Sequence, residues 1–244
     1  MKVPLFWLIP VLAIAADQDR VQQLFDGKLT PAQRAAACFE LRGKSDPDVV
    51  NALSRALNDP DLLSCAAADL RIAGAIEPLK QALSSQIFQV RAAAARQLGT
   101  FQKPELLEPL SLAAQDENAL VASSALSSLS QYGDAAVIPH LTAIARKGGM
   151  IGDMALDRLW QLDANTAVSV ARFLLSSRQV PDKLYAMRII GASGDLSDLP
   201  ELKKVAADHR ETLAQRDRGF GFMPGINLSR AAQSAIAAIE SRLK

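Results

Sequence analysis

Small and apolar residues recur along this chain with two nested periods. The short period is helical: an alanine is followed four residues later by leucine or isoleucine, which puts both on one helical face. The long period is about 30 residues, and it brings the same pair back six times. The six pairs are Ala37/Leu41, Ala66/Leu70, Ala94/Leu98, Ala125/Leu129, Ala155/Leu159 and Ala186/Ile190. The pattern predicts six similar helices, each with a small residue at a close helix contact.

A second anchor follows each pair, and it is proline in four of the six copies. These prolines are Pro78, Pro109, Pro139 and Pro200, while Asn51 and Ser169 hold the place in the first and fifth copies. Proline is tolerated in the first helical turn, where its missing N–H would have no partner. Each copy therefore predicts two helices joined by a short turn. A stack of such pairs is an all-α solenoid, an α-α superhelix of about six pairs with terminal caps.

The turn residues fit this reading. Thr30-Pro31 and Asp59-Pro60-Asp61 are typical of an N-cap followed by the first helical turn. Glycines near the ends of the first helices predict left-handed C-caps. They are Gly43, Gly74, Gly99, Gly133 and Gly194. Trp160 and Phe173 are expected to fill the core.

Two stretches carry a resemblance to a known family. They are Arg-Ala-Ala-Ala-Ala-Arg-Gln-Leu-Gly at 91–99 and Gly-Asp-Ala-Ala-Val-Ile-Pro at 133–139. The chain resembles the HEAT repeat family, in particular the short bacterial repeats also found in phycobilisome lyases. The resemblance covers about residues 30–206. It implies a HEAT-like solenoid and is a poor guide to function. The first and fifth repeats depart most: the first has Asn51 in the place of proline, and the fifth has Leu162-Asp163 where the family has Leu-Gly and Ser169 in the place of proline.

The two ends lie outside the repeat. Residues 1–15 combine one lysine, an apolar stretch and Ala13-Ile14-Ala15, which is typical of a signal peptide cleaved before Ala16. The alternative is an uncleaved N-terminal anchor or a buried helix. Residues 16–29 are expected to form an N-terminal cap helix. Residues 207–244 are an atypical extension, in which a long polar helix from Leu199 ends near Arg216. A closing helix at 228–243 then buries Ile236, Ile239 and Leu243.

Composition narrows the class of protein. The chain is 49% hydrophobic and 22% charged, which excludes a disordered chain and a polytopic membrane protein. Lys and Arg number 27 against 26 Asp and Glu. Such a balance lacks the basic excess of a nucleic-acid binder. Loss of Lys2 with the leader would make the mature chain formally neutral. We expect an exported protein, periplasmic or extracellular, with no membrane insertion after signal cleavage.

Candidate chemistry is sparse. The two histidines, His140 and His209, have no nucleophile or ligand set of recognisable spacing beside them, so we expect no catalytic, cofactor or metal site. Cys38 and Cys65 lie on first helices of adjacent repeats. They are either two small core residues or a disulfide, which an exported chain would permit.

Arginines near the first helices have two interpretations. They form ion pairs between repeats, or they line an anion-binding strip; the neutral charge balance favours pairing or a solvated surface over the strip. These arginines are Arg42, Arg71, Arg91, Arg96, Arg158 and Arg188.

Two classes of function remain. The first is a non-catalytic scaffold for a protein partner, because solenoids offer extended surfaces. Its candidate partner-binding residues are Phe220, Phe222 and Met223, in a glycine-rich loop that interrupts the repeat; the alternative is that they pack on the final helices as a cap. The second class is an enzyme or enzyme subunit like the phycobilin-lyase branch, which rests on the resemblance alone. A HEAT-like DNA glycosylase conflicts with export and with the neutral charge.

Overall fold

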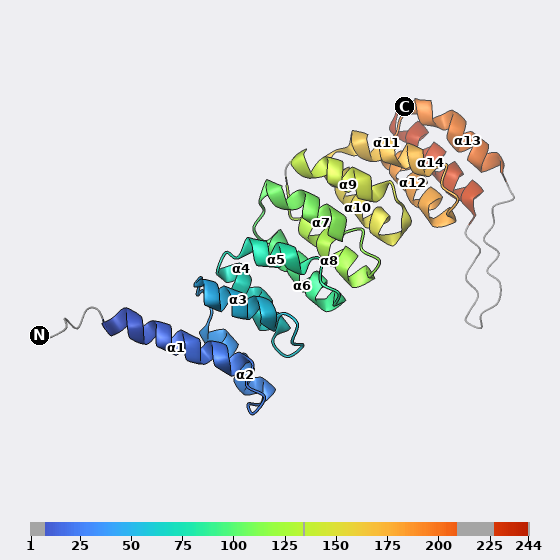
Figure 1. The fold of residues 1–244 in the computed structure, drawn as a ribbon. Helices are drawn as coiled ribbons and strands as arrows, with labels where there is room; N and C mark the ends of the chain where they lie inside the picture. The colour runs from blue at the N-terminus through green and yellow to red at the C-terminus, as the bar shows by residue number, and fades with distance from the viewer. Residues whose placement is uncertain (1–7, 134, 209–226, 244) are drawn as a thin grey trace, which may run out of the picture. The chain divides into compact units, whose positions relative to one another are not determined.

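The computed structural model describes residues 8–133, 135–208 and 227–243, with side chains from residue 16 onward. The regular elements of these residues are helices, as the all-α prediction requires (Figure 1). They divide into two compact units, with the boundary in the sequence between Tyr132 and Gly133. None of the helices in the described ranges is both long enough and apolar enough to cross a membrane.

Unit 1 holds the first three predicted helical pairs and the opening helix of the fourth. Its elements are α1 (Leu8–Leu24), α2 (Pro31–Glu40), α3 (Pro47–Ala56), α4 (Leu63–Ile72), α5 (Ile76–Ala82), α6 (Phe88–Gly99), the 3-10 turn η2 (Pro104–Leu106), α7 (Leu107–Ala113) and α8 (Ala119–Leu129). The first helices α2, α4, α6 and α8 pack in sequence order, each against the next. Unit 1 is therefore a stack of helical repeats.

Unit 2 continues the same plan. Its elements are η3 (Ala135–Val137), α9 (Ile138–Ala145), α10 (Gly149–Leu162), α11 (Ala164–Leu174), α12 (Val180–Ser193), η4 (Leu196–Asp198), α13 (Leu199–Ala207) and α14 (Leu228–Arg242). The helices α10 and α12 are the first helices of the fifth and sixth repeats. The closing helix α14 packs against α12 and α13, so it covers the end of the stack as a cap should.

The anchors of the predicted repeat form the core. All six alanines of the Ala/Leu pairs are at most 2% exposed, and all six leucine or isoleucine partners are 0% exposed. An alanine at each contact lets neighbouring helices approach closely, and close-packed interiors leave little room for a larger side chain there. The predicted register of the helices is confirmed by this burial. It also explains why the chain is rich in alanine and poor in aromatic residues.

Several local predictions hold. Thr30 caps α2 with a capping box, since its side chain accepts from the Gln33 N–H and the Gln33 side chain accepts from the Thr30 N–H. Gly43 and Gly74 end their helices in the left-handed region, with φ of 75° and 72°. A residue with a Cβ would be strained there.

Other local predictions differ from the structure in detail. Asp59 caps the turn before the next helix, since its Oδ1 accepts from the Asp61 N–H at 2.9 Å while its Oδ2 pairs with Arg34 of the preceding repeat. The helix α4 itself begins at Leu63. Gly99 does not form a left-handed cap, since α6 continues through it. A Cβ at Gly99 would lie 2.9 Å from the Cα of Ser128 on α8. The glycine permits a close helix approach. Gly194 has a negative φ of −71°.

The chain ends also differ from expectation. α1 starts at Leu8 and runs as one helix past Ala16, so it joins part of the predicted leader to the predicted cap. α13 ends at Ala207, short of Arg216, and residues 209–226 lie outside the described part. In α14 the buried stripe is Ala232, Ala235 and Ile239, while Leu243 is 49% exposed. Phe173 is likewise 55% exposed and does not fill the core.

Candidate functional site

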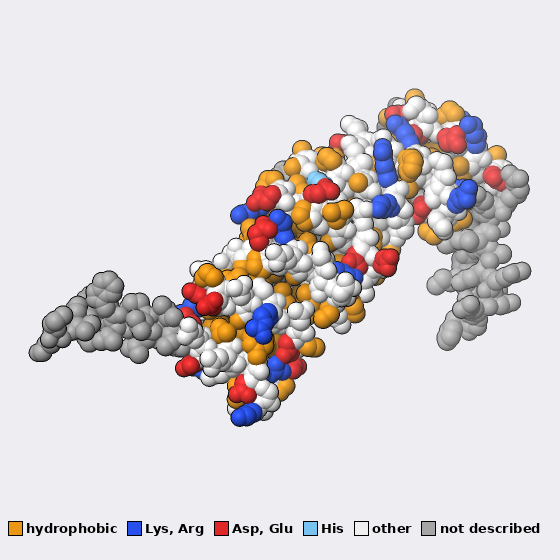
Figure 2. All heavy atoms as spheres, in the orientation of Figure 1, with side chains coloured by type: hydrophobic (Ala, Val, Ile, Leu, Met, Phe, Trp, Pro, Cys, Tyr) orange, Lys and Arg blue, Asp and Glu red, His pale blue; other side chains and the backbone are white. Residues whose placement is uncertain are grey.

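The predicted partner-binding residues cannot be placed. Phe220, Phe222 and Met223 lie outside the described residues, so their role stays a prediction. The arginine prediction is confirmed for three of the six side chains, which form ion pairs one repeat apart. These pairs are Arg42–Asp69, Arg91–Asp116 and Arg188–Asp157. On the face drawn in Figure 2, acidic and basic side chains are intermixed over the described atoms. That distribution suits ion pairing better than a strip of one sign.

The two cysteines are joined in a disulfide within unit 1. Cys38 on α2 and Cys65 on α4 have their Cα atoms 6.3 Å apart, inside the usual range of about 4.4–6.8 Å. Both are also core residues, at 0% and 6% exposed. The two interpretations of these cysteines are therefore compatible.

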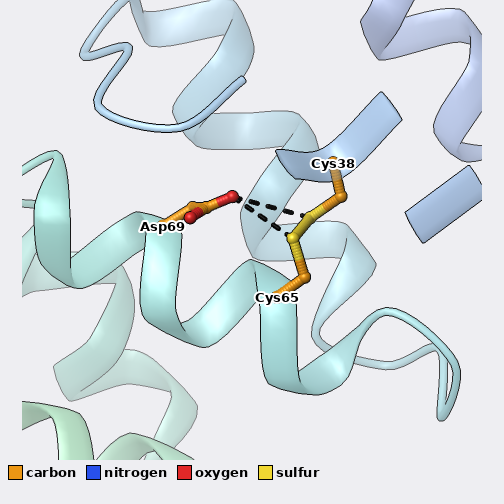
Figure 3. Close-up of side chains that lie close together, drawn as sticks. All are labelled: Cys38, Cys65 and Asp69. Atoms are coloured by element: carbon orange, nitrogen blue, oxygen red, sulfur yellow. Dashed lines mark hydrogen bonds between the residues drawn. A yellow bond between two sulfur atoms is a disulfide. The ribbon is translucent and has the colours of Figure 1, made fainter. Parts of the chain in front are cut away.

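Asp69 completes a buried cluster with the disulfide. It lies one turn after Cys65 on α4, is 0% exposed, and points at both sulfur atoms (Figure 3). Its Oδ2 is 3.2 Å from Cys65 Sγ and 3.8 Å from Cys38 Sγ. One ligand-type atom from each residue falls within 4.8 Å of the others. In the disulfide these sulfurs are not thiolates, which is the form of cysteine that ligates metal.

A pocket of about 540 Å³ lies in unit 2, between the first helices of the fifth and sixth repeats. Its lining comes from the start of α10 and the start of α12. The residues are Gly149, Met150, Asp153, Met154, Gln179, Pro181, Asp182 and Tyr185. Met150 and Met154 are 66% and 45% exposed. The pocket thus combines flexible apolar side chains with two carboxylates.

Asp182 is fixed in place by its neighbours. It is 4% exposed, and it accepts hydrogen bonds from the Gly149 N–H at 2.9 Å and from the Ser177 hydroxyl at 2.6 Å. Gly148 leaves room for it: a Cβ there would lie 2.7 Å from the Asp182 Cγ, and its φ of 69° is left-handed. The two glycines therefore let the turn before α10 wrap around a buried carboxylate of the next repeat.

Asp153 differs, because one of its carboxylate oxygens has no donor. Its Oδ1 is buried, and no hydrogen-bond donor among the described residues reaches it. Burial, followed by the charges of Asp182 and Asp157, raises the pKa of Asp153 to about 6. Near neutral pH this carboxyl is mostly ionised, and it lacks the hydrogen bonds that buried charges normally have.

The third carboxylate of this region is already engaged. Tyr185 and Arg188 on α12 both donate to Asp157 on α10. Burial and the Asp157 contact raise the pKa of Tyr185 to about 12, so the tyrosine is a neutral donor at physiological pH. Arg188 also lies over the Tyr185 ring, at 4.3 Å from the ring centre. These contacts hold α10 and α12 together beside the pocket, and the Arg188 charge offsets only part of the rise in the pKa of Asp153.

Sequence reasoning missed this pocket. A signal was present, because Met150, Asp153 and Met154 fall on one face of a helix that begins with two glycines. The companion residues Asp182 and Tyr185 come one repeat later. Without the stacking distance, each set looks like ordinary solvated surface.

Comparison with known proteins agrees with the repeat. Residues 76–149 match the family model of HEAT repeats. The match supports HEAT repeats as the repeating unit of this chain. It does not extend to the phycobilisome-lyase type. No curated protein matches the chain significantly.

Several solved structures are similar at low identity. Human deoxyhypusine hydroxylase in complex with glycerol is 19% identical with a TM-score of 0.40, over 95% of this chain and 99% of that chain. An engineered protein is 18% identical, with a TM-score of 0.33 over 92% and 96% of the two chains. A designed armadillo repeat protein is 17% identical, with a TM-score of 0.33 over 91% and 98%. At these scores the likenesses carry no argument about function.

Proposed function

We propose that this chain is an exported, non-catalytic HEAT-repeat scaffold whose pocket between α10 and α12 receives a lysine or arginine side chain of a protein partner. The observation that carries the proposal is the buried Oδ1 of Asp153, which has no donor among the described residues. A partner's ammonium or guanidinium group in the pocket would place a compensating charge beside that carboxyl.

The rest of the pocket suits the same ligand. Lysine and arginine have long aliphatic stems below their charged heads. The exposed side chains of Met150 and Met154, with Pro181 and Tyr185, offer apolar surface for such a stem. Methionine adapts its shape to irregular partners, which is why it is frequent on protein-binding surfaces. The negative charge of Asp153 and the apolar surface around it favour a basic side chain over an acidic or a purely apolar one.

Export rests on the leader pattern of residues 1–15, and the contacts of α1 with unit 1 are compatible with cleavage of that leader. The first described side-chain ion pair of this helix is Asp17 with Lys44 at 3.2 Å, followed by Arg20 with Glu40 at 2.5 Å. Leu24 at the end of α1 is 0% exposed. Cleavage before Ala16 would keep all three of these contacts in the mature chain.

The binding proposal is tested with two mixtures of synthetic decapeptides and the full chain. One mixture carries lysine or arginine at a fixed central position, and the other carries the neutral analogues norleucine or citrulline there. Fluorescence anisotropy at pH 7.5 should show that the basic mixture binds and that the neutral mixture binds at least tenfold more weakly. Asp153→Asn should remove that preference, and Met150→Ser with Met154→Ser should weaken both mixtures.

The matched control is Leu196→Ser, which removes a side chain that is 58% exposed in the same unit and outside the pocket. It should bind like the wild type. The preference should also fade as the pH falls from 7.5 to 5, because Asp153 becomes neutral below its pKa of about 6. Equal affinity for the two mixtures, or an unchanged preference of Asp153→Asn for the basic mixture, would overturn the proposal.

Export has its own test. A C-terminally tagged full-length chain, expressed in a bacterium, should be recovered from the extracytoplasmic fraction and should begin at Ala16 on N-terminal sequencing. Recovery from the cytosol with Met1 intact would remove the export part and leave the pocket unaffected.

A further inference from the structure

The disulfide in unit 1 poses a chemical problem for Asp69. A sulfur atom in a disulfide carries no hydrogen, so neither Cys38 nor Cys65 can donate to the Asp69 Oδ2 that faces both of them. A buried carboxylate oxygen without a donor is unfavourable. A protonated Asp69 resolves this, because its O–H can donate to the Cys65 sulfur at 3.2 Å.

Reduction reverses the hydrogen bonding. Two thiols have two S–H groups, and both sulfurs already lie beside Oδ2 (Figure 3). An ionised Asp69 could then accept from them. Hydrogen bonds to the charged form favour that form. The carboxyl group therefore holds its proton more tightly when the cysteines are joined than when they are reduced.

The remaining surroundings of Asp69 do not depend on the redox state. Arg42, which follows α2, donates from Nε to the other oxygen, Oδ1, at 3.3 Å. Burial raises the pKa of Asp69, and Arg42 opposes this more weakly. Besides α2, the helices α3, α5 and α6 pack against α4. Among the described residues, these three place no ionisable group in contact with the Asp69 carboxyl.

We propose that Cys38 and Cys65 are a redox couple whose reduction by a dithiol releases one proton from Asp69. In this step the protein's S–S bond breaks and two S–H bonds form. The reductant supplies two electrons and two hydrogens and is oxidised to its own disulfide. The proton of Asp69 goes to solvent, and the carboxylate accepts from the new thiols. The proposal concerns unit 1 only and does not rest on the pocket of unit 2.

The coupling has a signature at equilibrium. Exchange between the protein disulfide and dithiothreitol involves no net proton below the pKa of the thiols, so its equilibrium constant would ordinarily not change with pH. If Asp69 loses a proton on reduction, the constant rises with pH by up to tenfold per pH unit. The rise is confined to the pH range in which Asp69 is protonated in the disulfide state and ionised in the dithiol state.

The experiment equilibrates the full chain with mixtures of reduced and oxidised dithiothreitol from pH 5 to pH 8. Acid quenching, alkylation and mass spectrometry then give the thiol and disulfide fractions. The wild type should show the rise, and Asp69→Asn should be flat. Asp48→Asn, which changes an exposed carboxylate in the same unit, should keep the rise. A flat wild-type constant, or a rise that persists in Asp69→Asn, would overturn the proposal.

A second measurement covers the case in which Asp69→Asn does not fold. Infrared difference spectra of the wild type, oxidised minus reduced, should contain the C=O stretch of a protonated carboxyl group in the oxidised state. That band should disappear on reduction. A spectrum without such a band, or free thiols found in the chain before any reductant is added, would contradict the proposal without use of a variant.

Discussion

The contact between α6 and α8 makes a prediction that runs against helix propensity. Gly99 is the last residue of α6, and alanine is the better helix former by roughly 1 kcal/mol. We nevertheless expect Gly99→Ala to destabilise unit 1. The new Cβ would lie 2.9 Å from the Cα of Ser128, and nearer still to the Ser128 side chain. A backbone atom cannot rotate away from such a contact.

The magnitude follows from what Ser128 would have to give up. Ser128 is 1% exposed, and its hydroxyl donates to the Ala95 carbonyl at 2.9 Å. Moving it costs a buried hydrogen bond, roughly 0.5–1.5 kcal/mol, in addition to overpacking of about 1–3 kcal/mol. Against the gain in propensity of roughly 1 kcal/mol, the net loss is about 0.5–3.5 kcal/mol. For a chain of this size that lowers Tm by roughly 2–4 °C per kcal/mol.

Thermal and urea unfolding, followed by circular dichroism, measure this loss, and amide exchange should show faster opening of α6 and α8 than of other helices. The matched control is Gly27→Ala, where a Cβ would meet nothing within 4 Å. It should leave Tm unchanged or slightly higher, because alanine restricts the unfolded chain. An unchanged or raised Tm in Gly99→Ala would refute the close approach of the two helices.

Further outcomes follow from the same structure. Ala94→Leu and Ala125→Leu should each cost about 1–3 kcal/mol by overpacking the stack, and an unchanged Tm in both would contradict the repeat register. Asp153→Asn should raise the free energy of unfolding at pH 8 by on the order of 1 kcal/mol, a figure reduced because the carboxyl is partly exposed. The gain should vanish as the pH falls from about 6 to about 4, because the wild-type carboxyl becomes protonated in that range. In Arg91→Met, Tm should fall less between about pH 5 and 3 than it does in the wild type. The reason is that Arg91 lowers the pKa of Asp116 and so stabilises the fold only while Asp116 is ionised. An equally steep fall of Tm in the variant would count against that pairing.

The fold could be predicted from the sequence because every repeat solves the same packing problem. An alanine and a leucine one turn apart must be buried in each copy, so the pattern recurs six times and fixes the helix faces. The errors occur where a neighbouring repeat overrides a local signal. Gly99 has the place of a C-cap but accommodates Ser128 of the next repeat. Asp59 keeps its local bond to the Asp61 N–H and in addition pairs with Arg34, which the local sequence does not reveal.

The disulfide shows how the repeat register could have been used further. Cys38 lies one residue after its anchor alanine, and Cys65 one residue before, which argues at first against a bond. Successive residues of a helix are about 100° apart, so these two offsets lie on opposite flanks of the helix. In a stack, one flank faces the following repeat and the other faces the preceding one. Opposite offsets therefore bring the cysteines together, at a Cα distance of 6.3 Å.

The pocket was harder to predict, because each of its two segments by itself resembles an ordinary surface helix. Residues 150–154 look like a half-apolar helix start, and residues 181–185 look like another one repeat later. What sets them apart is that the fifth repeat departs from the pattern: Gly148 and Gly149 are both left-handed, and Ser169 stands in the place of proline. A regular repeat would suffice to pack the helices of the stack. The irregular turn at Gly148 and Gly149 instead makes room for Asp182. The irregular turn places the buried Asp182 carboxylate beside Asp153, one oxygen of which has no hydrogen-bond donor among the described residues. This arrangement lowers the stability of the free protein. The binding of a basic side chain is the event that would recover it.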